Sequence, residues 1–342
     1  MKNIVFIMNP ISGTVSKSAI PSMIEKLLDK ELFSYDIRET QYAGHATEIA
    51  HQAIDEGVDI VCAIGGDGTV NEVGRALIGS QTALAIIPCG SGNGLARHLM
   101  LPMDAGKAIK IINMCEIHDL DYGIINEKPF FCTCGMGFDA FISMKFAEAG
   151  KRGLTTYLEN VLKEGLKYKP ETYEVEDETG THRHKAFLIA CANASQYGNN
   201  AYIAPGATMK DGMMDVIIME PFDTIEAPQI AADLFMKTLG NNSKIKTFRS
   251  RHIHIRRKEA GAIHYDGDPI MTGTDIDISI EHLGIRIVTN PEAKEDTAQP
   301  NPVLNAFSDL FNNINNVRED ISKQGRRIQI INKLMLRRLS KL

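Results

Sequence analysis

The sequence predicts an α/β nucleotide-binding domain with a parallel sheet, then a mainly antiparallel β-rich domain, then a helical tail. The chain has 342 residues, more than one ordinary core needs. Short apolar runs alternate with amphipathic stretches in its first third, and strand-like runs replace this rhythm after about residue 120. We expect the three parts to cover residues 1–122, 123–290 and 291–342.

The first third reads as strands and helices in strict alternation. Because strands joined through helices run parallel, a sheet covered on both faces is expected. The expected elements are the strand Ile4–Met8, the helix Ser18–Leu28, the strand Tyr35–Glu39, the helix Ala46–Glu56, the strand Ile60–Ile64, the helix Val70–Ile78, the strand Ala83–Ile87 and a helix that begins at Gly94.

Residues beyond about 120 alternate strand-like runs with Gly, Asn, Asp and Pro clusters, which is typical of antiparallel sheets. A helical insertion is expected around Phe141–Tyr168, a linker over Pro291–Pro302 and a helix over Val303–Leu342. The expected strands are Glu116–Tyr122, Phe130–Cys134, Tyr173–Asp177, Ala186–Ala192, Met214–Met219, His252–Arg256 and Ile276–Ile280.

The composition is that of a soluble globular protein, with 44% apolar and 23% charged residues. A formal net charge of −6 argues against a nucleic-acid partner. The apolar start runs straight into Asn9-Pro10 without a small-residue cleavage site, so we expect a buried strand and no signal peptide. The six cysteines lack the paired spacing of a disulfide framework, which favours reduced thiols and a cytoplasmic location.

Glycine-rich turns follow three of the expected strands and precede helices. Because the carboxyl ends of parallel strands share one edge, the three turns should converge there. Glycine lets backbone N–H groups approach phosphate oxygens, and a helix N-terminus adds positive partial charge. The sequence therefore predicts a polyphosphate site at this edge. The turns are Asn9-Pro10-Ile11-Ser12-Gly13-Thr14, Gly65-Gly66-Asp67-Gly68-Thr69 and Pro88-Cys89-Gly90-Ser91-Gly92-Asn93-Gly94.

Asp67 puts a carboxylate inside one of these phosphate-binding turns. A carboxylate repels phosphate unless a cation lies between them, and the Mg²⁺ carried by a nucleotide is such a cation. The alternative is that Asp67 only caps the helix that follows it. Neither a Walker P-loop nor a Rossmann glycine pattern is present.

These motifs resemble the diacylglycerol kinase catalytic-domain family of lipid kinases, which includes bacterial diacylglycerol kinases, sphingosine kinases and ceramide kinases. The resemblance covers roughly residues 1–290, and the tail lies outside it. It is carried by Asn9-Pro10-x-Ser12-Gly13, Gly65-Gly66-Asp67-Gly68-Thr69-Val70-Asn71-Glu72-Val73, Pro88-x-Gly90-Ser91-Gly92-Asn93-x-x-Ala96-Arg97, Gly137-Phe138-Asp139-Ala140, Pro205-x-Ala207-x-x-x-Asp211-Gly212-x-x-Asp215 and Asp266-Gly267-Asp268.

The resemblance implies an ATP site in a cleft between the two domains, with Asp67 organising the Mg²⁺–phosphate network. It also implies a second Mg²⁺ site at Asp211, for which a tight turn between strands is the alternative. The residues that should contact ATP are Asn9, Pro10, Ser12, Gly13, Thr40, Gly65, Gly66, Asp67, Gly68, Thr69, Asn71, Gly90, Ser91 and Asn93.

On the acceptor side, the family usually has Asp-Gly-Glu, whose Glu is the proposed general base. Here Asp268 stands at that position, one methylene shorter, and Asp266 is the substitute candidate. A hairpin turn with exposed acids is the alternative interpretation. Asp139 matches a residue on the acceptor-lipid side, and it could equally cap the following helix.

The resemblance implies an enzyme that transfers the γ-phosphate of MgATP to a lipid hydroxyl from the cytoplasmic side of a membrane. Two alternatives are an NAD kinase-like enzyme and a catalytically idle nucleotide- or lipid-binding regulator. The tail from Ile321 to Leu342 is basic and amphipathic, which fits an anionic lipid surface. Packing of the tail against the protein or a second subunit, as in a homodimer, is left open.

Overall fold

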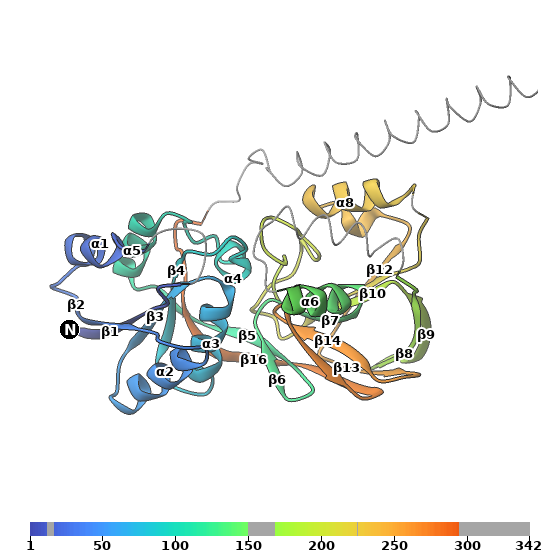
Figure 1. The fold of residues 1–342 in the computed structure, drawn as a ribbon, viewed down its shortest axis with the longest axis horizontal. Coiled ribbons are helices and arrows are strands. Elements are labelled where there is room, and N and C mark those ends of the chain that lie inside the picture. Colours follow the sequence, from blue (N-terminus) through green and yellow to red (C-terminus); the bar gives the residue numbers. More distant parts are fainter. Residues whose placement is uncertain (12–16, 150–167, 224, 294–342) are drawn as a thin grey trace, which may run out of the picture. The chain divides into compact units, whose positions relative to one another are not determined.

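The computed structural model describes residues 1–11, 17–149, 168–223 and 225–293. These described residues group into one compact unit (Figure 1). Most of the expected linker and the whole of the expected helical tail lie outside the described residues, so the tail stays a prediction.

The expected parallel sheet is confirmed. Its strands lie in the order β2-β1-β3-β4 and pair in parallel. The helix α3 begins at Asp67, three residues before the expected start. The elements are β1 (Lys2–Met8), α1 (Ile20–Leu27), β2 (Phe33–Glu39), α2 (His45–Asp55), β3 (Ile60–Gly65), α3 (Asp67–Leu77) and β4 (Ala83–Pro88).

Helices cover both faces of this sheet because side chains alternate along each strand. Ile4 and Phe6 of β1 pack in one core cluster with α1 and α5 (Ala105–Met114). Val5 and Ile7 pack in another with α2 and α3. The helix expected from Gly94 is a short α4 (Gly94–His98), and α5 follows after a break.

The second sheet is antiparallel, as expected, with the order β12-β11-β10-β7-β14-β15. The helix α6 (Phe138–Ala149) packs against β7 and β14. The helix α8 (Ala227–Phe235) follows β11. The strands are β7 (Thr133–Gly137), β10 (Leu188–Ala192), β11 (Met214–Met219), β12 (Ile245–Ser250), β14 (Gly261–Tyr265) and β15 (Asp268–Thr272).

The long strand β16 (Asp275–Val288) belongs to both halves of the unit, as Figure 1 shows. It pairs with β13 (His252–Arg257) and β5 (Ile117–Ile125), and its end lies beside β4. Two further strands, β8 (Glu171–Asp177) and β9 (Gly180–Ala186), continue the sheet beyond β13. Because β16 pairs with strands that lie on both sides of residue 122 in the sequence, it does not define a domain boundary there. The boundary expected after residue 122 stays a prediction.

The strand expected over Phe130–Cys134 is divided into β6 (Lys128–Phe130) and β7. Between them, the N–H groups of Phe131 and Cys132 donate to the Asp266 carboxylate. The sequence also does not predict β9, whose residues are mostly polar and exposed and therefore lack an apolar alternation.

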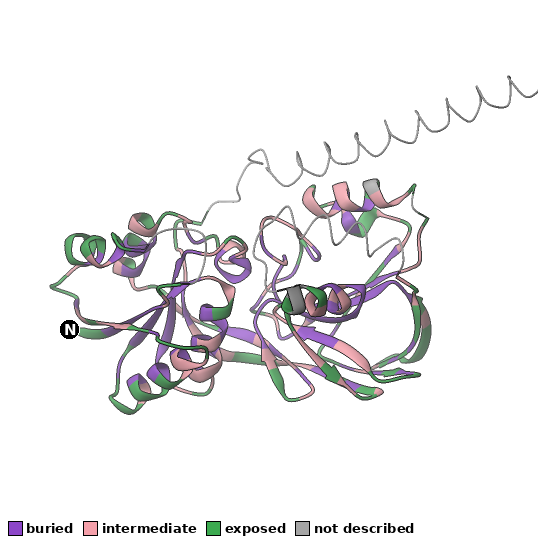
Figure 2. Ribbon diagram, in the orientation of Figure 1, coloured by how far each residue is buried: buried purple, intermediate pink, exposed green. Residues whose placement is uncertain are grey.

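Buried residues gather along the strands of both sheets (Figure 2). Five of the six cysteines are buried and all six are free thiols, which agrees with the expectation from their spacing. The helices in the described part of the chain are too short or too polar to span a bilayer.

A buried carboxylate, Asp121 of β5, connects three segments near the middle of the unit. One oxygen accepts the Gly212 N–H at 2.7 Å. The other accepts from the His282 ring Nδ1 and from the Leu283 N–H, both at 2.8 Å. Since Asp121 is fully buried, its two oxygens depend on these donors in place of water.

We predict that Asp121→Asn lowers the free energy of unfolding by about 1–3 kcal/mol, because an amide nitrogen would face at least one of the three donors. Denaturant unfolding measures this loss. Asp119→Asn, at an exposed position of the same strand, is the control and should change the free energy by less than about 0.5 kcal/mol. Equal losses in the two variants would show that the buried carboxylate has no special role.

Candidate active site

Three glycine-rich turns meet at one edge of the parallel sheet. They follow β1, β3 and β4, which are adjacent and parallel. The Asn9 N–H donates to Ile64 O at 3.2 Å, and the Cys89 N–H donates to Gly65 O at 2.7 Å. A Cβ on Gly90 would lie 2.7 Å from the Cα of Gly66, so the second and third turns touch through their backbones.

The first turn reaches the second through Asn9, whose side-chain amide donates to the Thr69 hydroxyl at 3.4 Å. Thr40 continues the edge, because its N–H donates to Met8 O at 2.9 Å. Pro10 follows Asn9 on the same turn. Ser12 and Gly13, which the sequence places in the nucleotide site, lie outside the described residues.

The Asp67 carboxylate joins the second turn to the third. Its Oδ2 accepts the Asn93 N–H at 2.8 Å, and its Oδ1 accepts the Gly94 N–H at 2.7 Å. Asp67 therefore caps α4, whereas α3 has Gly66 at its N-cap and no side-chain cap. A Cβ on Gly92 would lie 2.7 Å from Oδ2, so glycine is needed there for the close approach.

Asn93 holds the third turn closed. Its backbone is left-handed, with φ of 52°, a conformation that Asn tolerates better than most residues. Its side-chain oxygen accepts the Gly90 N–H at 3.0 Å and its amide donates to Gly90 O at 2.7 Å. Gly68 and Ser91 are exposed on these turns, whereas Asn71 is buried within α3.

A buried cation, Lys17, lies beside the third turn, and sequence reasoning missed it. Lys17 is only 4% exposed. Its charge lowers the pKa of the Cys89 thiol, against the stronger effect of burial, which raises that pKa. Its positive charge contributes to the electrostatic potential at this edge. The chain has 37 Lys and Arg residues, and no sequence signal separates this one from the others.

The residues present fit a Mg²⁺–phosphate ligand at this edge. Each Asp67 oxygen accepts one backbone N–H, and a carboxylate has about four acceptor positions, so acceptor capacity remains for water bound to a cation. Asp67 is also half-buried and not sealed from solvent.

Asp139 lies at the start of α6 and is held by two elements. Its Oδ2 is 3.1 Å from His264 Nε2 of β14, and the Tyr197 hydroxyl donates to the same oxygen at 3.4 Å. The Gly267 N–H donates to His264 Nδ1 at 3.4 Å, so the other ring nitrogen carries the proton and donates to Asp139. The other oxygen, Oδ1, accepts the Ala140 N–H at 2.8 Å.

Asp268 lies at the first position of β15, with its side chain 51% exposed. Its Oδ2 accepts from Arg75 Nη1 of α3 at 3.1 Å. Arg75 also lies over the Tyr265 ring, 4.6 Å from its centroid, and donates to Pro129 O at 3.1 Å. Since 193 residues separate Arg75 from Asp268, the sequence offers no signal for this pair.

Asp266 differs from its neighbour, because its side chain is only 3% exposed. Its oxygens accept the N–H groups of Phe131 at 2.8 Å, Cys132 at 2.7 Å and Thr133 at 3.1 Å. Burial raises the pKa of Asp266, while these donors and Arg75 act in the opposite direction. The hairpin between β14 and β15 therefore has one exposed acid, Asp268, and one buried acid, Asp266. The alternative interpretation, a hairpin turn with exposed acids, expects both to be exposed.

Asp211 lies in a tight turn, where one oxygen accepts the Met213 N–H at 3.1 Å and the other pairs with Arg249. An arginine against the carboxylate competes with a metal ion for it. The described residues contain no group of three or more His, Cys, Asp or Glu side chains placed to hold a metal. These contacts favour the interpretation of Asp211 as part of a tight turn between strands. The second Mg²⁺ site at Asp211 stays a prediction.

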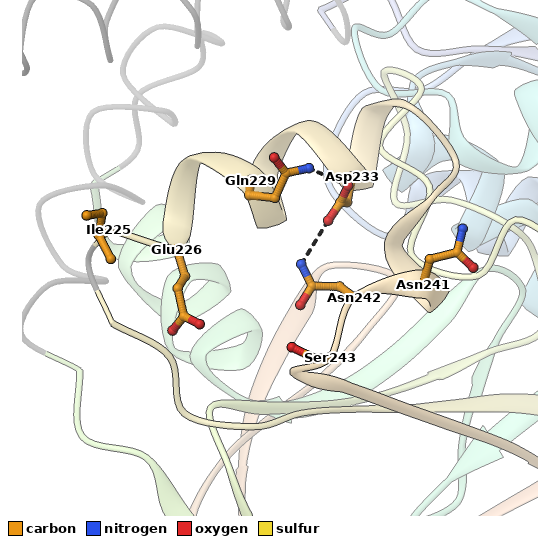
Figure 3. Close-up of a pocket in the computed structure, with 7 residues that line it drawn as sticks. All are labelled: Ile225, Glu226, Gln229, Asp233, Asn241, Asn242 and Ser243. Carbon is orange, nitrogen blue, oxygen red and sulfur yellow. Dashed lines mark hydrogen bonds between the residues drawn. The ribbon is translucent and has the colours of Figure 1, made fainter.

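Two cavities lie on the β-rich half. The larger one, about 490 Å³, is lined by Ile225 and by polar residues before, on and after α8 (Figure 3). There Asp233 accepts from Gln229 at 2.9 Å and from Asn242 at 2.8 Å. Its polar groups thus bind one another, and we assign it no ligand.

The smaller cavity, about 220 Å³, has both apolar and charged walls. Its lining residues are Gly137, Phe141, Met144, Lys145, Tyr168, Glu171, Arg257, Ala262 and Met271. Ala262 and His264 are two residues apart on β14 and so lie on one face. One wall of the cavity therefore lies on the same face of β14 as His264.

We predict that Asp266→Asn destabilises the fold by about 1–3 kcal/mol, because the amide cannot accept all three N–H groups. Asp268→Asn is the control and should cost less than about 1 kcal/mol, the usual range for an exposed ion pair. Thermal or denaturant unfolding of both variants checks this. A stable Asp266→Asn protein would contradict the bracing role of this carboxylate.

Models of two protein families match the chain. The diacylglycerol kinase catalytic domain matches residues 3–125. The YegS C-terminal NAD kinase beta sandwich-like domain matches residues 133–278. The first match contains the three glycine-rich turns, and the second contains Asp139, Asp211, Asp266 and Asp268.

Relatives and solved structures agree with these matches. A "Probable lipid kinase YegS-like" of Klebsiella pneumoniae is 31% identical over 206 residues, which are 59% of this chain and 69% of that protein. A "Putative lipid kinase" of Streptococcus pneumoniae is 26% identical over 86% of this chain and its own full length.

The crystal structure of a putative diacylglycerol kinase from Bacillus anthracis str. Sterne has the same fold. Its TM-score is 0.67 at 22% identity, over 85% of this chain and 97% of that one. Taken with the identity to the Klebsiella relative, these matches show that the chain belongs to the diacylglycerol kinase catalytic-domain family of lipid kinases.

Proposed function

We propose that the chain transfers the γ-phosphoryl group of MgATP to a hydroxyl group of a membrane lipid, such as diacylglycerol or a sphingoid-type lipid. The observation that carries this proposal is the Asp67 carboxylate, which joins two glycine-rich turns at the edge of a parallel sheet. A phosphate cradle with a carboxylate in it suits a nucleotide that brings a cation.

ATP would lie along the three turns, with its phosphates near the exposed Gly68 and Ser91 and the N-terminus of α3. Lys17 adds a positive charge at the same edge. Asp67 would hold the Mg²⁺ of the nucleotide, and the bound ion would neutralise charge on the phosphates. Because Asp67 is tied to α4, its carboxylate is already oriented before the nucleotide arrives.

The acceptor lipid would present its hydroxyl near Asp139. The Asp139 carboxylate keeps the capacity to accept a hydrogen bond from a head-group hydroxyl or amine, because it has about four acceptor positions and three donors. The apolar side chains Phe141, Met144 and Met271 line part of the smaller cavity of about 220 Å³ and suit the first part of a hydrocarbon chain.

Asp268 would remove the proton from the lipid hydroxyl as its oxygen attacks the γ-phosphorus, with ADP as the leaving group. The reaction then gives lipid phosphate, ADP and a proton held on Asp268. Arg75 fixes the carboxylate of Asp268, which is one methylene shorter than the usual Glu. Asp266 would brace the turn, because its oxygens already accept three N–H groups.

The membrane is the proposed partner, and we propose peripheral association from the cytoplasmic side. The basic segment from Ile321 to Leu342 would attract anionic lipid head groups. This segment lies outside the described residues, so the proposal rests on its sequence alone.

The direct test offers a panel of lipids in mixed micelles with labelled MgATP and identifies the phosphorylated product. The panel contains diacylglycerol, a long-chain base and ceramide, with NAD as a separate acceptor. NAD is included because the second family model describes an NAD kinase-like sandwich. Phosphorylated NAD without lipid phosphate would favour the NAD kinase alternative, and no product from any acceptor would favour the idle regulator.

We predict that Asp67→Ala lowers turnover by about 10²-fold or more, because charge on the transferring group is no longer compensated. Asp104→Ala is the matched control, since Asp104 caps α5 by accepting the Lys107 N–H at 2.9 Å. Each change removes a helix cap and should cost about 0.5–2 kcal/mol of stability. Initial rates and melting curves separate the two effects, and equal activity in both variants would remove Asp67 from the mechanism.

We predict that Asp268→Asn lowers kcat by about 10²–10⁴-fold, the usual range for one acid–base group. The KM for ATP should stay within about twofold, because the group acts on the acceptor. Asp268→Glu should retain activity, since it restores the residue usual in the family. Steady-state kinetics with the lipid that the wild-type protein phosphorylates measure kcat and the KM for ATP of both variants. A fully active Asp268→Asn protein would show that proton removal does not depend on this residue.

A further inference from the structure

A loop of the β-rich half, Ser195–Ala201, contacts both parts of the candidate active site, and we call it the bridging loop. Its backbone is closed by the Tyr197 N–H donating to Ala201 O at 3.0 Å and the Ala201 N–H donating to Gly198 O at 2.9 Å. Gly198, Asn199 and Asn200 have positive φ values of 114°, 51° and 60°. The loop therefore has a defined, left-handed conformation that depends on its residue types.

The bridging loop packs on the third glycine-rich turn. The Asn199 N–H donates to Gly92 O at 3.2 Å, and a Cβ on Gly198 would lie 3.0 Å from the Cα of Gly92. The Asp67 carboxylate approaches Gly92 as well, because a Cβ on Gly92 would lie 2.7 Å from Asp67 Oδ2. The third turn is thus held by Asp67 and by the bridging loop.

Arg97 of α4 strengthens this contact. Its Nε donates to Gly92 O at 2.9 Å, and its Nη1 donates to the Asn200 side chain at 3.4 Å. The start of the loop is attached to the same helix, because the Ser195 N–H donates to His98 Nδ1 at 3.1 Å. A shift of α4 and its turn would therefore be transmitted to the loop.

The same loop reaches the acceptor side through Tyr197. The Tyr197 hydroxyl donates to Asp139 Oδ2 at 3.4 Å, and this oxygen also pairs with His264. Gly198 and Tyr197 are neighbours in the chain, yet one contacts the nucleotide turn and the other contacts the acceptor carboxylate. A segment that contacts two sites can couple them when the ligands of both sites favour the same position of that segment.

We infer that the bridging loop is a positioning element that couples the nucleotide site to the acceptor site, with Gly198 and Tyr197 as its two contact residues. This inference rests on the proposed function. A nucleotide on the third turn fixes Gly92, the loop then fixes Tyr197, and Tyr197 holds Asp139 in place for the acceptor hydroxyl. By reciprocity, the acceptor lipid increases the affinity for the nucleotide.

The test measures binding of a nonhydrolysable ATP analogue with Mg²⁺ by calorimetry, with and without the lipid that the wild-type protein phosphorylates. The wild-type protein should bind the analogue about fivefold more tightly or better with the lipid present. In Gly198→Ala and Tyr197→Phe this ratio should fall close to one. The control Gly206→Ala, where a Cβ meets no atom within 4 Å, should keep the wild-type ratio.

Kinetics give a second readout that a purely structural role would not change. Tyr197→Phe should raise the KM for the lipid by about fivefold, the equivalent of one hydrogen bond. By reciprocity it should also raise the KM for ATP measured at saturating lipid. Gly198→Ala should raise the KM for ATP, because its Cβ presses on Gly92. If Gly198→Ala does not fold, Asn200→Gly replaces it, since glycine accepts the positive φ and only the Arg97 contact is lost.

The outcomes separate the two levels of the proposal. The coupling role of the loop would be overturned if both loop variants kept the wild-type ratio of analogue affinities with and without lipid, and the wild-type KM values. If the wild-type protein is active, the proposed function would still stand. A wild-type protein that phosphorylates no lipid would overturn the proposed function and this inference together. A lower melting temperature alone, with unchanged KM values, would reduce the loop to a structural element.

Discussion

The pair of hydrogen bonds from Asn93 and Gly94 to the Asp67 carboxylate is the interaction on which the site depends. It brings a negative charge into a turn whose backbone N–H groups suit phosphate. The two N–H groups compensate part of that charge, and the remaining lone pairs leave room for a cation with its water. Glycine is needed at positions 90 and 92, because a Cβ there would lie 2.7 Å from the Gly66 Cα and from Asp67 Oδ2, respectively.

Two more buried carboxylates repeat this arrangement away from the phosphate edge. Asp121 and Asp266 each accept three donors from segments distant in sequence. Hydrogen bonds to an ionised acceptor are stronger than neutral ones and are expensive to leave unmade in a buried site. They hold the middle of β5 against β16 and the end of β14 against the start of β7.

The sequence predicts the parallel sheet and the positions of the glycine-rich turns well, because both depend on local pattern. Short continuous apolar runs mark β1, β3 and β4, and each turn follows its strand directly. Long-range contacts have no such signal. Asp67 meets Gly94, which is 27 residues away, and Asp268 meets Arg75 across 193 residues.

Similar reasons explain the elements that the sequence does not predict. The strand β9 is held by its pairing with β8. Its side chains are mostly polar and exposed, so the sequence has no alternation of apolar and polar residues that would predict a strand. Asp266 and Asp268 are one glycine apart in the same hairpin, and their different burial follows from the N–H groups of residues 131–133, which only Asp266 reaches. The tail and residues 12–16 lie outside the described residues, and the expectations for them stay predictions.

The most direct test of the account is amide hydrogen exchange of the wild-type protein with and without the nonhydrolysable ATP analogue and Mg²⁺. Exchange reports where a ligand orders or covers backbone N–H groups. We predict slower exchange at Gly65–Thr69 and Gly90–Gly94, the two turns that Asp67 connects. Unchanged exchange in these turns, with slowing at the polar cavity beside α8 instead, would contradict the assignment of the phosphate site.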